Sequence, residues 1–376
     1  MGADPVGPWQ PRYTLTPRQA RHLMEIEAVR TVVEQTPLGP AVQSEIRNRA
    51  RLRSTHFSTQ IEGNRLTLAE AEQVLAGRRV LLHGRERDVG EVRSYWRALL
   101  RVEEWAERGA GLTEELIQRL HALVEGRSRP SQYRDGQNTI RDSATGALVY
   151  LPPEARDVPA LMASLVAWVR KAEDERLPPP LIAGLAHYQF VTIHPYYDGN
   201  GRTARLLATF LLQRDGYGLN GLVSLEEEHA RDLGAYFSAL AVHPHHNYYE
   251  GRDTADLTPW LEYYLTVLAR AFTATKEEIA LGASRGGSQG EPEALRRLDA
   301  RARAVLALFA SQDRITAPEV ARLLGLSDRT ARLLLQKWTE DGWLLVANPS
   351  RRGRVYELSA SYRQLIGNST AAGEPR

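Results

Sequence analysis

The 376-residue chain contains no cysteine, and this absence excludes disulfide bonds, thiolate metal sites and cysteine nucleophiles. The chain also has no apolar run of membrane-spanning length, and its N-terminal residues lack the apolar stretch of a secretory signal peptide. We therefore expect a cytoplasmic protein without membrane contacts. Lysine is scarce, at three residues, so arginine supplies nearly all of the basic side chains.

The formal net charge is only +2, so no global electrostatic field calls for a nucleic-acid or acidic-lipid partner. The hydrophobic fraction of 43% and the charged fraction of 25% are typical of a soluble globular protein. A chain of this length usually forms two or three domains, each with its own core. Helical periodicity dominates, and the predicted fold class is mainly α, with β-hairpins in only two places.

The most informative stretch runs from His194 to Arg205 and reads His-Pro-Tyr-Tyr-Asp-Gly-Asn-Gly-Arg-Thr-Ala-Arg. Apolar, helix-like runs precede and follow it. Gly and Asn residues allow successive backbone N–H groups to face one concave nest, and such nests bind anions at helix N-termini. Arg202 lies three residues before Arg205, so the two cations share one side of the first helical turn. This arrangement suits a polyphosphate.

Two further side chains of this stretch bear on its chemistry. Asp198 is a hard oxygen ligand, and one carboxylate together with phosphate oxygens is a common way to hold Mg²⁺. His194 is the natural proton acceptor near neutral pH. The residues alone therefore predict Mg²⁺-assisted chemistry on a bound nucleotide phosphate. A functionless glycine-rich turn is the alternative, but it leaves the clustering of these side chains unexplained.

The stretch resembles the active-site motif of the Fic family, H-x-F-x-[D/E]-G-N-G-R-x-x-R, and departs from it only at Tyr196, where phenylalanine is usual. Most members of that family transfer AMP from ATP to a Ser, Thr or Tyr hydroxyl of a protein and release pyrophosphate. The resemblance implies ATP as a substrate, His194 as the general base and Mg²⁺ on Asp198.

The same resemblance assigns the phosphate contacts. It implies that the α- and β-phosphates are cradled by Gly199, Asn200 and Gly201. Arg202 would bind the β-phosphate and Arg205 the γ-phosphate. A homodimer is also common in the family. Removal of AMP from a modified protein would use the same residues, so the sequence does not separate removal from transfer.

A second motif lies at the end of a helix predicted over Val42–Ile61, where Gly63 is a natural stop signal. Glu62 falls in the last turn, next to the negative end of the helix dipole, with Ser58 one turn earlier. From the residues alone, a solvated glutamate at a helix end fits well. The pattern Ser58-x-x-x-Glu62-Gly63, however, resembles the Fic inhibitory motif [S/T]-x-x-x-E-[G/N]. It implies that Glu62 pairs with Arg205 and occupies the γ-phosphate position.

Residues 139–151 change from helical to extended character. Thr139–Arg141 and Ala147–Leu151 could form a short hairpin or a surface excursion. Beside a Fic core this segment resembles the flap over the active site. Its strand edge could hold a target segment, with Val149 and Tyr150 as the docking side chains.

For several other residues the sequence allows two predicted roles. Val191 could line the nucleotide pocket, and Tyr236 or Phe237 could flank the adenine or pack in the core. His187 is expected to be a packed, hydrogen-bonded core residue. The run from His243 to His246 favours a polar loop over a metal site, because Pro244 breaks the helical spacing and no acidic partner is adjacent.

Composition, together with the resemblance to the Fic family, predicts five segments. They are an N-terminal helical region (1–110), the Fic core (111–272), a linker (273–294), a C-terminal domain (295–362) and a disordered tail (363–376).

In the C-terminal domain, the order helix, helix-turn-helix, hairpin predicts a winged helix. It could bind duplex DNA, which would make the chain a DNA-binding transcriptional regulator whose Fic nucleotide site acts as a sensor, or it could serve dimer or target contacts. The candidate DNA contacts are the basic side chains of the second helix and the hairpin: Arg329, Arg332, Lys337, Arg351, Arg352 and Arg354.

Overall fold

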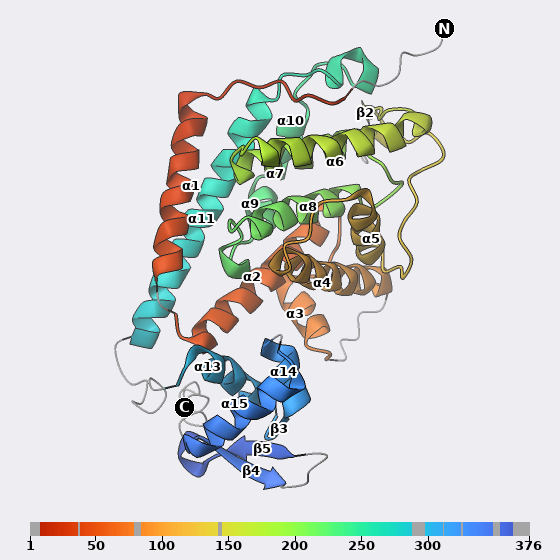
Figure 1. The fold of residues 1–376 in the computed structure, drawn as a ribbon. Helices are drawn as coiled ribbons and strands as arrows, with labels where there is room; N and C mark the ends of the chain where they lie inside the picture. Colours follow the sequence, from red (N-terminus) through yellow and green to blue (C-terminus); the bar gives the residue numbers. More distant parts are fainter. Residues whose placement is uncertain are drawn as a thin grey trace. The chain divides into compact units, whose positions relative to one another are not determined.

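The computed structural model describes residues 8–36, 38–78, 84–141, 145–287, 298–310, 312–324, 326–348 and 354–363. It is mainly helical, as predicted, and divides into two compact units (Figure 1). One unit comprises Met1–Thr36 with Ile46–Ile279, and the other comprises Pro37–Glu45 with Ala280–Arg376. Among the described residues, no helix is both long and apolar enough to cross a membrane.

Among its described residues, the first unit contains all or most of each of eleven α-helices and a small hairpin. The helices are α1 (Pro17–Gln35), α2 (Pro40–Ile61), α3 (Leu68–Leu75), α4 (Glu86–Glu107), α5 (Glu114–Val124), α6 (Val158–Asp174), α7 (Pro179–Ile193), α8 (Asn200–Arg214), α9 (Leu225–Arg231), α10 (Leu233–Leu240) and α11 (Thr258–Gly287). The hairpin pairs β1 (Ile140–Arg141) with β2 (Leu148–Tyr150), antiparallel, at the place predicted. Short 3₁₀ or π turns are η1 (Ala155–Asp157), η2 (Leu219–Gly221) and η3 (Tyr248–Arg252).

The helix pair α7 and α8 forms the centre of this unit (Figure 1). Helix α7 is apolar all round and is buried on nearly every side, which is how a helix without a polar face is stabilised. It ends at His194, whose backbone is left-handed at φ 49° and ψ 60°. Helix α8 begins after Gly199, which is also left-handed at φ 75°. The predicted motif therefore comprises the loop between the two central helices and the first turns of α8.

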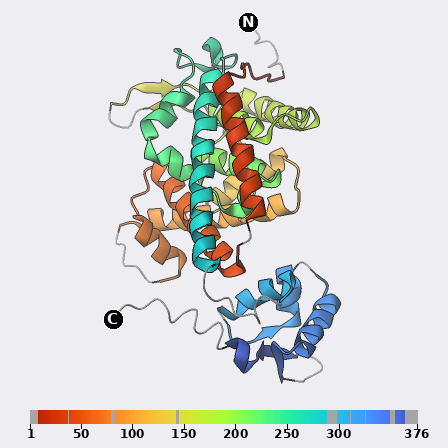
Figure 2. The ribbon, with the colours of Figure 1, turned by 90° about the vertical axis from the view of Figure 1, so that its left-hand side faces the viewer.

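Helix α1 lies along α11, although the two are far apart in the sequence (Figures 1 and 2). Thr16 caps α1 in a reciprocal capping box with Gln19. The buried Gln19 amide also donates to the backbone oxygen of Thr258, at 2.8 Å, and Arg18 pairs with Glu262 at 2.8 Å. The capping residue of one helix thus also satisfies a first-turn carbonyl group of the other.

In the part of the chain that the structure describes, the second unit contains three α-helices and a three-stranded sheet. The helices are α13 (Ala300–Leu306), α14 (Ala317–Leu324) and α15 (Asp328–Glu340), and the 3₁₀ turn η4 spans Ala307–Ala310. The antiparallel sheet has the order β3-β5-β4, with β3 at Ile315–Thr316, β4 at Leu344–Asn348 and β5 at Val355–Leu358. Trp338 and Trp343 are almost fully buried in its core.

One predicted boundary differs from the structure. Helix α11 continues to Gly287, so the segment predicted as a linker from residue 273 begins as helix, in keeping with its Ala, Lys and Glu content. The rest of that linker from residue 288 and the tail from residue 364 lie outside the described residues. Helix α4 contains Gly90, and Glu86 and Asp88 in its first turn interact favourably with the positive end of the helix dipole.

A close helix contact gives a test of this packing. Gly184 in α7 accepts a hydrogen bond from the Trp260 indole nitrogen at 2.7 Å, and a Cβ at this position would lie 2.6 Å from the Tyr264 ring. Gly184→Ala should therefore overpack the α7–α11 contact and lower the free energy of unfolding by about 1–3 kcal/mol.

The matched control is Gly90→Ala, at an exposed position of α4, where an added Cβ meets nothing within 4 Å. It should raise the free energy of unfolding by about 0.5–1 kcal/mol, because alanine is the better helix former. The two variants should shift the urea midpoint of the full chain in opposite directions. Shifts of the same sign would contradict the described contact.

Candidate active site

The motif loop is held in shape by the side chain of Asn200. Its Oδ1 accepts from the Tyr196 backbone N–H at 3.0 Å, and its Nδ2 donates to the Tyr196 carbonyl at 2.7 Å. No side chain caps the N-terminus of α8. The orphan N–H groups of the first turn and the positive end of the dipole therefore remain available to an anion.

Both glycines of the loop are required by close contacts. A Cβ at Gly199 would lie 2.7 Å from Glu125 Oε1 and 3.2 Å from His121 Nε2. A Cβ at Gly201 would lie 2.2 Å from Glu62 Oε1. The carboxylate of Glu62 therefore lies directly against the first turn of α8, which is where an anionic ligand of this nest would bind.

His194 is available as a base. Its Nδ1 lies 3.4 Å from the Val191 carbonyl, and because a carbonyl only accepts, Nδ1 carries the hydrogen and Nε2 keeps its lone pair. Burial lowers the pKa of His194 to about 4, so the imidazole is neutral at pH 7. Its backbone oxygen accepts from Arg134 Nε at 2.9 Å, which helps to fix the left-handed turn.

Arg205 is 2% exposed and is held by two residues of α2 and the turn after it. Its Nε donates to Ser58 Oγ, and its Nη2 donates to the Ser58 carbonyl and to Glu62 Oε1, each at 2.8 Å. The Glu62–Arg205 pairing expected from the sequence is thus present. The buried Nη1 of Arg205 has no hydrogen-bond partner.

Arg202 is also buried, with 3% of its surface exposed, and it pairs with two carboxylates. Its Nη2 donates to Glu125 Oε1 at 3.2 Å and to Asp198 Oδ1 at 3.3 Å, while its buried Nε has no partner. Donors left unsatisfied in both arginines are costly in a closed core but suit a site that receives an anion.

Asp198 is the most exposed of these charged groups, at 59% of its side chain, and Arg87 lies 3.5 Å from its Oδ2. Within the described part of the chain, no group of three or more His, Cys, Asp or Glu side chains is arranged to hold a metal ion. The donor set at this mouth is therefore one accessible carboxylate. That set fits Mg²⁺ only when a bound ligand supplies further oxygens, as a nucleotide phosphate does.

Sequence reasoning missed three residues of the site: His121, Glu125 and Arg134. His121 stacks on Tyr196 with ring centroids 3.6 Å apart; its Nε2 donates to the Asp198 carbonyl at 2.9 Å, and its Nδ1 accepts from the Ser131 hydroxyl at 2.7 Å. Burial lowers the pKa of His121 to about 4, which keeps this tautomer neutral. The tyrosine at the position where phenylalanine is usual thus serves as a stacking platform.

In the flap, the structure corrects the prediction that Tyr150 docks the target. Val149 is 44% exposed, as docking requires, but Tyr150 is 4% exposed, and its hydroxyl donates to the Thr192 carbonyl at 2.7 Å. Because successive side chains of a strand point to opposite faces, only one of the two could face a target. Tyr150 is a buried anchor of the flap. The run from His243 to His246 lies beside the flap, since the Leu151 N–H donates to the His246 carbonyl at 2.7 Å.

The aromatic residues behind Arg205 form part of the core. His187 is fully buried and hydrogen-bonds the Tyr236 hydroxyl at 2.9 Å, which confirms the prediction of a packed core histidine. Tyr236 is 1% exposed, whereas Phe237 exposes 52% of its surface and Val191 is half-buried. Of the two adenine candidates, only Phe237 presents its ring to solvent in this structure.

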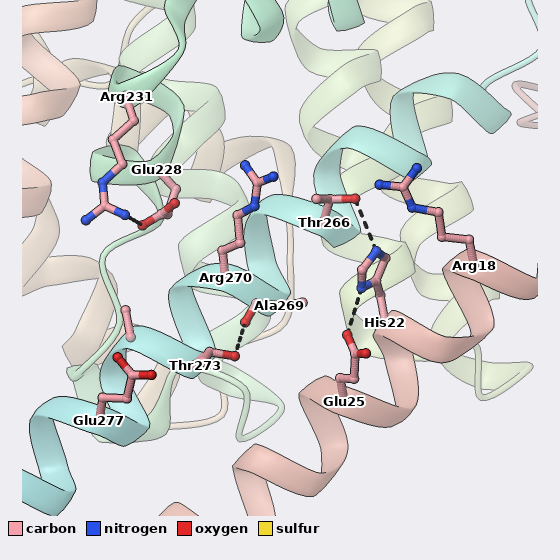
Figure 3. A pocket seen from close by; sticks show the side chains of 11 residues that line it. Arg18, His22, Glu25, Glu228, Arg231, Thr266, Ala269, Arg270, Thr273 and Glu277 are labelled. Atoms are coloured by element: carbon pink, nitrogen blue, oxygen red, sulfur yellow. Dashed lines mark hydrogen bonds and ion pairs between the residues drawn. The ribbon is translucent and has the colours of Figure 1, made fainter.

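A separate pocket of about 460 Å³ lies between α1, α9 and α11 (Figure 3). None of the motif residues lines it. Two pairs of its ionisable side chains bond each other, Arg231 with Glu228 at 2.6 Å and His22 with Glu25 at 2.9 Å.

With this geometry in place, the chain can be compared with known proteins. Residues 111–212 match the sequence profile described as the Fic/DOC family. The chain therefore contains a segment similar to the Fic domain. The matched segment contains α5, the flap, α6, α7, the whole motif loop and most of α8.

Curated relatives share the same part. The Protein adenylyltransferase Fic of Nematostella vectensis is 29% identical over 204 residues, covering 52% of this chain and 45% of the relative. The protein of that name in Drosophila sechellia is 33% identical over 163 residues, covering 43% of this chain and 32% of the relative. The chain thus matches less than half the length of these relatives.

Solved structures resemble more of the chain. A Fic family protein from Desulfovibrio desulfuricans G20 aligns with a TM-score of 0.59 and 27% identity, covering 94% of this chain and 99% of that one. A Fic domain containing signaling protein from Bacteroides thetaiotaomicron aligns with a TM-score of 0.61 and 25% identity, covering 72% and 100%.

The buried histidine behind Arg205 gives a test of the electrostatics. Burial, with a smaller effect of Arg205, lowers the pKa of His229 from 6.5 to about 3. The unfolded chain therefore binds this proton at a higher pH than the folded chain, so the stability that His229 provides is complete above pH 6.5 and falls as the pH drops.

At pH 5 this linkage should cost roughly 2 kcal/mol relative to pH 7. His229→Gln should reduce the loss of unfolding free energy between pH 7 and pH 5 by about that amount, measured by urea denaturation at both pH values. An unchanged pH dependence would mean that His229 takes up its proton equally in both states.

Proposed function

We propose that this chain is a self-inhibited protein adenylyltransferase that transfers AMP from ATP to a Ser, Thr or Tyr hydroxyl of a protein, including itself. One observation carries the proposal. Two buried arginines of the motif, Arg202 and Arg205, lie in the first turns of α8 and keep unpartnered donors near its uncapped N-terminus. A neutral imidazole, that of His194, is part of the same motif.

The site suits a nucleoside triphosphate by its donor set. Backbone N–H groups at Gly199, Asn200 and Gly201 would receive the α- and β-phosphates. Arg202 Nε would donate to the β-phosphate and Arg205 Nη1 to the γ-phosphate. Asp198 would hold Mg²⁺, which supplies positive charge to the phosphate oxygens when it is bound.

In the proposed reaction, the target hydroxyl oxygen forms a bond to the α-phosphorus of ATP. His194 Nε2 takes the hydroxyl proton. The bond from the α-phosphorus to the bridging oxygen breaks, and pyrophosphate leaves with that electron pair. The low pKa of His194 means that the proton-accepting form is present throughout the neutral range. Val149 on the flap would contact the target segment next to its hydroxyl.

Self-inhibition is supported by the place of Glu62. Its carboxylate bonds Arg205 at 2.8 Å and lies against Gly201, so it competes with the terminal phosphate for the same cation. A charge-assisted hydrogen bond of this kind is worth roughly 1.5–3 kcal/mol. That energy is enough to displace a γ-phosphate from its productive position while leaving the rest of the nucleotide bound.

Incubation with α-labelled ATP and Mg²⁺ tests the reaction. Glu62→Gly should raise incorporation of AMP into protein about tenfold or more, because it removes the competing carboxylate. His194→Ala in that background should lower the rate by at least about a hundredfold.

The matched control is Glu107→Gly, which makes the same substitution at the exposed end of α4 and should not change incorporation. Equal rates for Glu62→Gly and wild type would reject self-inhibition. Labelling that survives His194→Ala would reject the base. Loss of AMP from a pre-modified protein, without transfer, would support a hydrolase that uses the same residues.

The second unit supports a further function, binding of duplex DNA by a winged helix. Helix α15 buries Ala331, Leu335 and Trp338 and presents the opposite side to solvent. The exposed side includes Arg329, Arg332 and Lys337, and Arg354 is exposed at the start of the β5 segment. These side chains suit phosphate and base-edge contacts. The other two candidates, Arg351 and Arg352, lie outside the described residues.

Fluorescence anisotropy of the full chain with a labelled duplex tests this function. Binding should weaken steeply between about 50 and 200 mM salt, because each phosphate contact releases counterions. Replacing Arg329 and Arg332 together by alanine should reduce the salt slope by roughly two. Arg301→Ala, on α13, is the control. If binding is absent or does not depend on salt, the proposal of DNA binding is wrong, and protein contacts remain as the alternative role of the winged helix.

A further inference from the structure

The two arginines of the motif are each held by a carboxylate from another part of the fold. Arg205 is held by Glu62, at the end of α2, whereas Arg202 is held by Glu125, at the C-terminal cap of α5. Neither the motif nor the inhibitory pattern includes Glu125. Its carboxylate lies 3.2 Å from Arg202 Nη2, and its side chain is only 15% exposed.

The two guanidinium groups differ in which of their nitrogen atoms are hydrogen-bonded. Ser58 and Glu62 together engage Nε and Nη2 of Arg205. Glu125 engages only Nη2 of Arg202, the corner that Asp198 also contacts, and leaves Nε without a partner. Glu125 thus fixes one corner of a buried guanidinium without consuming the donor that the proposed function assigns to a phosphate.

The loop is also built around this carboxylate. A Cβ at Gly199 would lie 2.7 Å from Glu125 Oε1, so the backbone of the nest packs directly on Glu125. Asp198, the other partner of Arg202, is 59% exposed and would turn to Mg²⁺ in the proposed complex. Glu125 would then remain as the carboxylate that neutralises and orients Arg202.

We propose that Glu125 is a positioning residue for nucleotide binding: it holds the Arg202 guanidinium so that its free N–H groups face the β-phosphate. This inference rests on the proposed function and extends it to a residue of α5. A second inhibitory carboxylate is the competing role, and the sign of the effect on affinity separates the two. Removing an inhibitor tightens nucleotide binding, whereas removing a positioning residue weakens it.

Isothermal titration of ATP, ADP and AMP tests the proposal, in a parent protein that carries Glu62→Gly and His194→Ala so that no turnover occurs. Glu125→Ala should weaken ATP and ADP about tenfold, the loss expected for one charge-assisted hydrogen bond, and leave AMP unchanged because AMP has no β-phosphate. Glu125→Gln retains an acceptor for Arg202 and should stay within about threefold of the parent.

The matched control is Glu115→Ala, which removes an exposed carboxylate of the same helix that pairs with Arg119, and it should change none of the affinities. Should Glu125→Ala fail to fold, Glu125→Asp serves in its place. It keeps the charge but withdraws the carboxylate by one methylene, and it should also weaken ADP selectively.

Arg202→Ala separates the failure of this inference from failure of the proposed function. If the parent binds no ATP, or if Arg202→Ala leaves ADP affinity unchanged, the proposed phosphate site is wrong. If Arg202→Ala weakens ADP but Glu125→Ala does not, or if Glu125→Ala tightens ADP or weakens AMP equally, the positioning role is overturned.

Discussion

The structure depends on the burial of two guanidinium groups at the start of α8. A buried cation is tolerated only with a partner and with its donors satisfied. Arg202 and Arg205 are 3% and 2% exposed, and each has a carboxylate within 3.2 Å while another of its donors stays free. The carboxylates stabilise the two buried arginines in the folded chain, and the free donors can still bind an anion.

This requirement explains why distant parts of the chain converge on one loop. Helix α2 ends beside Arg205, and α5 ends beside Arg202, so both carboxylates come from helix C-termini. A carboxylate is poorly placed at that end of its own helix, where the dipole is negative. The cations at the positive N-terminus of α8 offset that cost, and the same field would favour a phosphate.

Much of this site could be predicted from sequence because its parts are local. The stretch from His194 to Arg205 carries its glycines, its carboxylate and its arginines within one turn and one helix start. Glu62 was recognisable only through its short motif with Ser58. The mainly helical fold and the hairpin followed from periodicity and turn residues, and the buried place of His187 from the apolar face around it.

The remaining contacts depend on tertiary packing and left no local signal. His121 and Glu125 share a face with ordinary helical spacing, and nothing in α5 marks them apart from its other polar residues. Tyr150 was predicted to be a docking residue because the sequence shows neither the strand face on which it lies nor its hydrogen bond to the Thr192 carbonyl.

The central claim is that the Glu62 carboxylate occupies the place of a nucleotide's terminal phosphate. A crystal structure of Glu62→Gly with ATP and Mg²⁺ tests it most directly. The account predicts electron density for the γ-phosphate against Gly201, within hydrogen-bonding distance of Arg205 Nη1, and the α-phosphate beside His194. A γ-phosphate that points away from Arg205, or an empty groove at the start of α8, would contradict it.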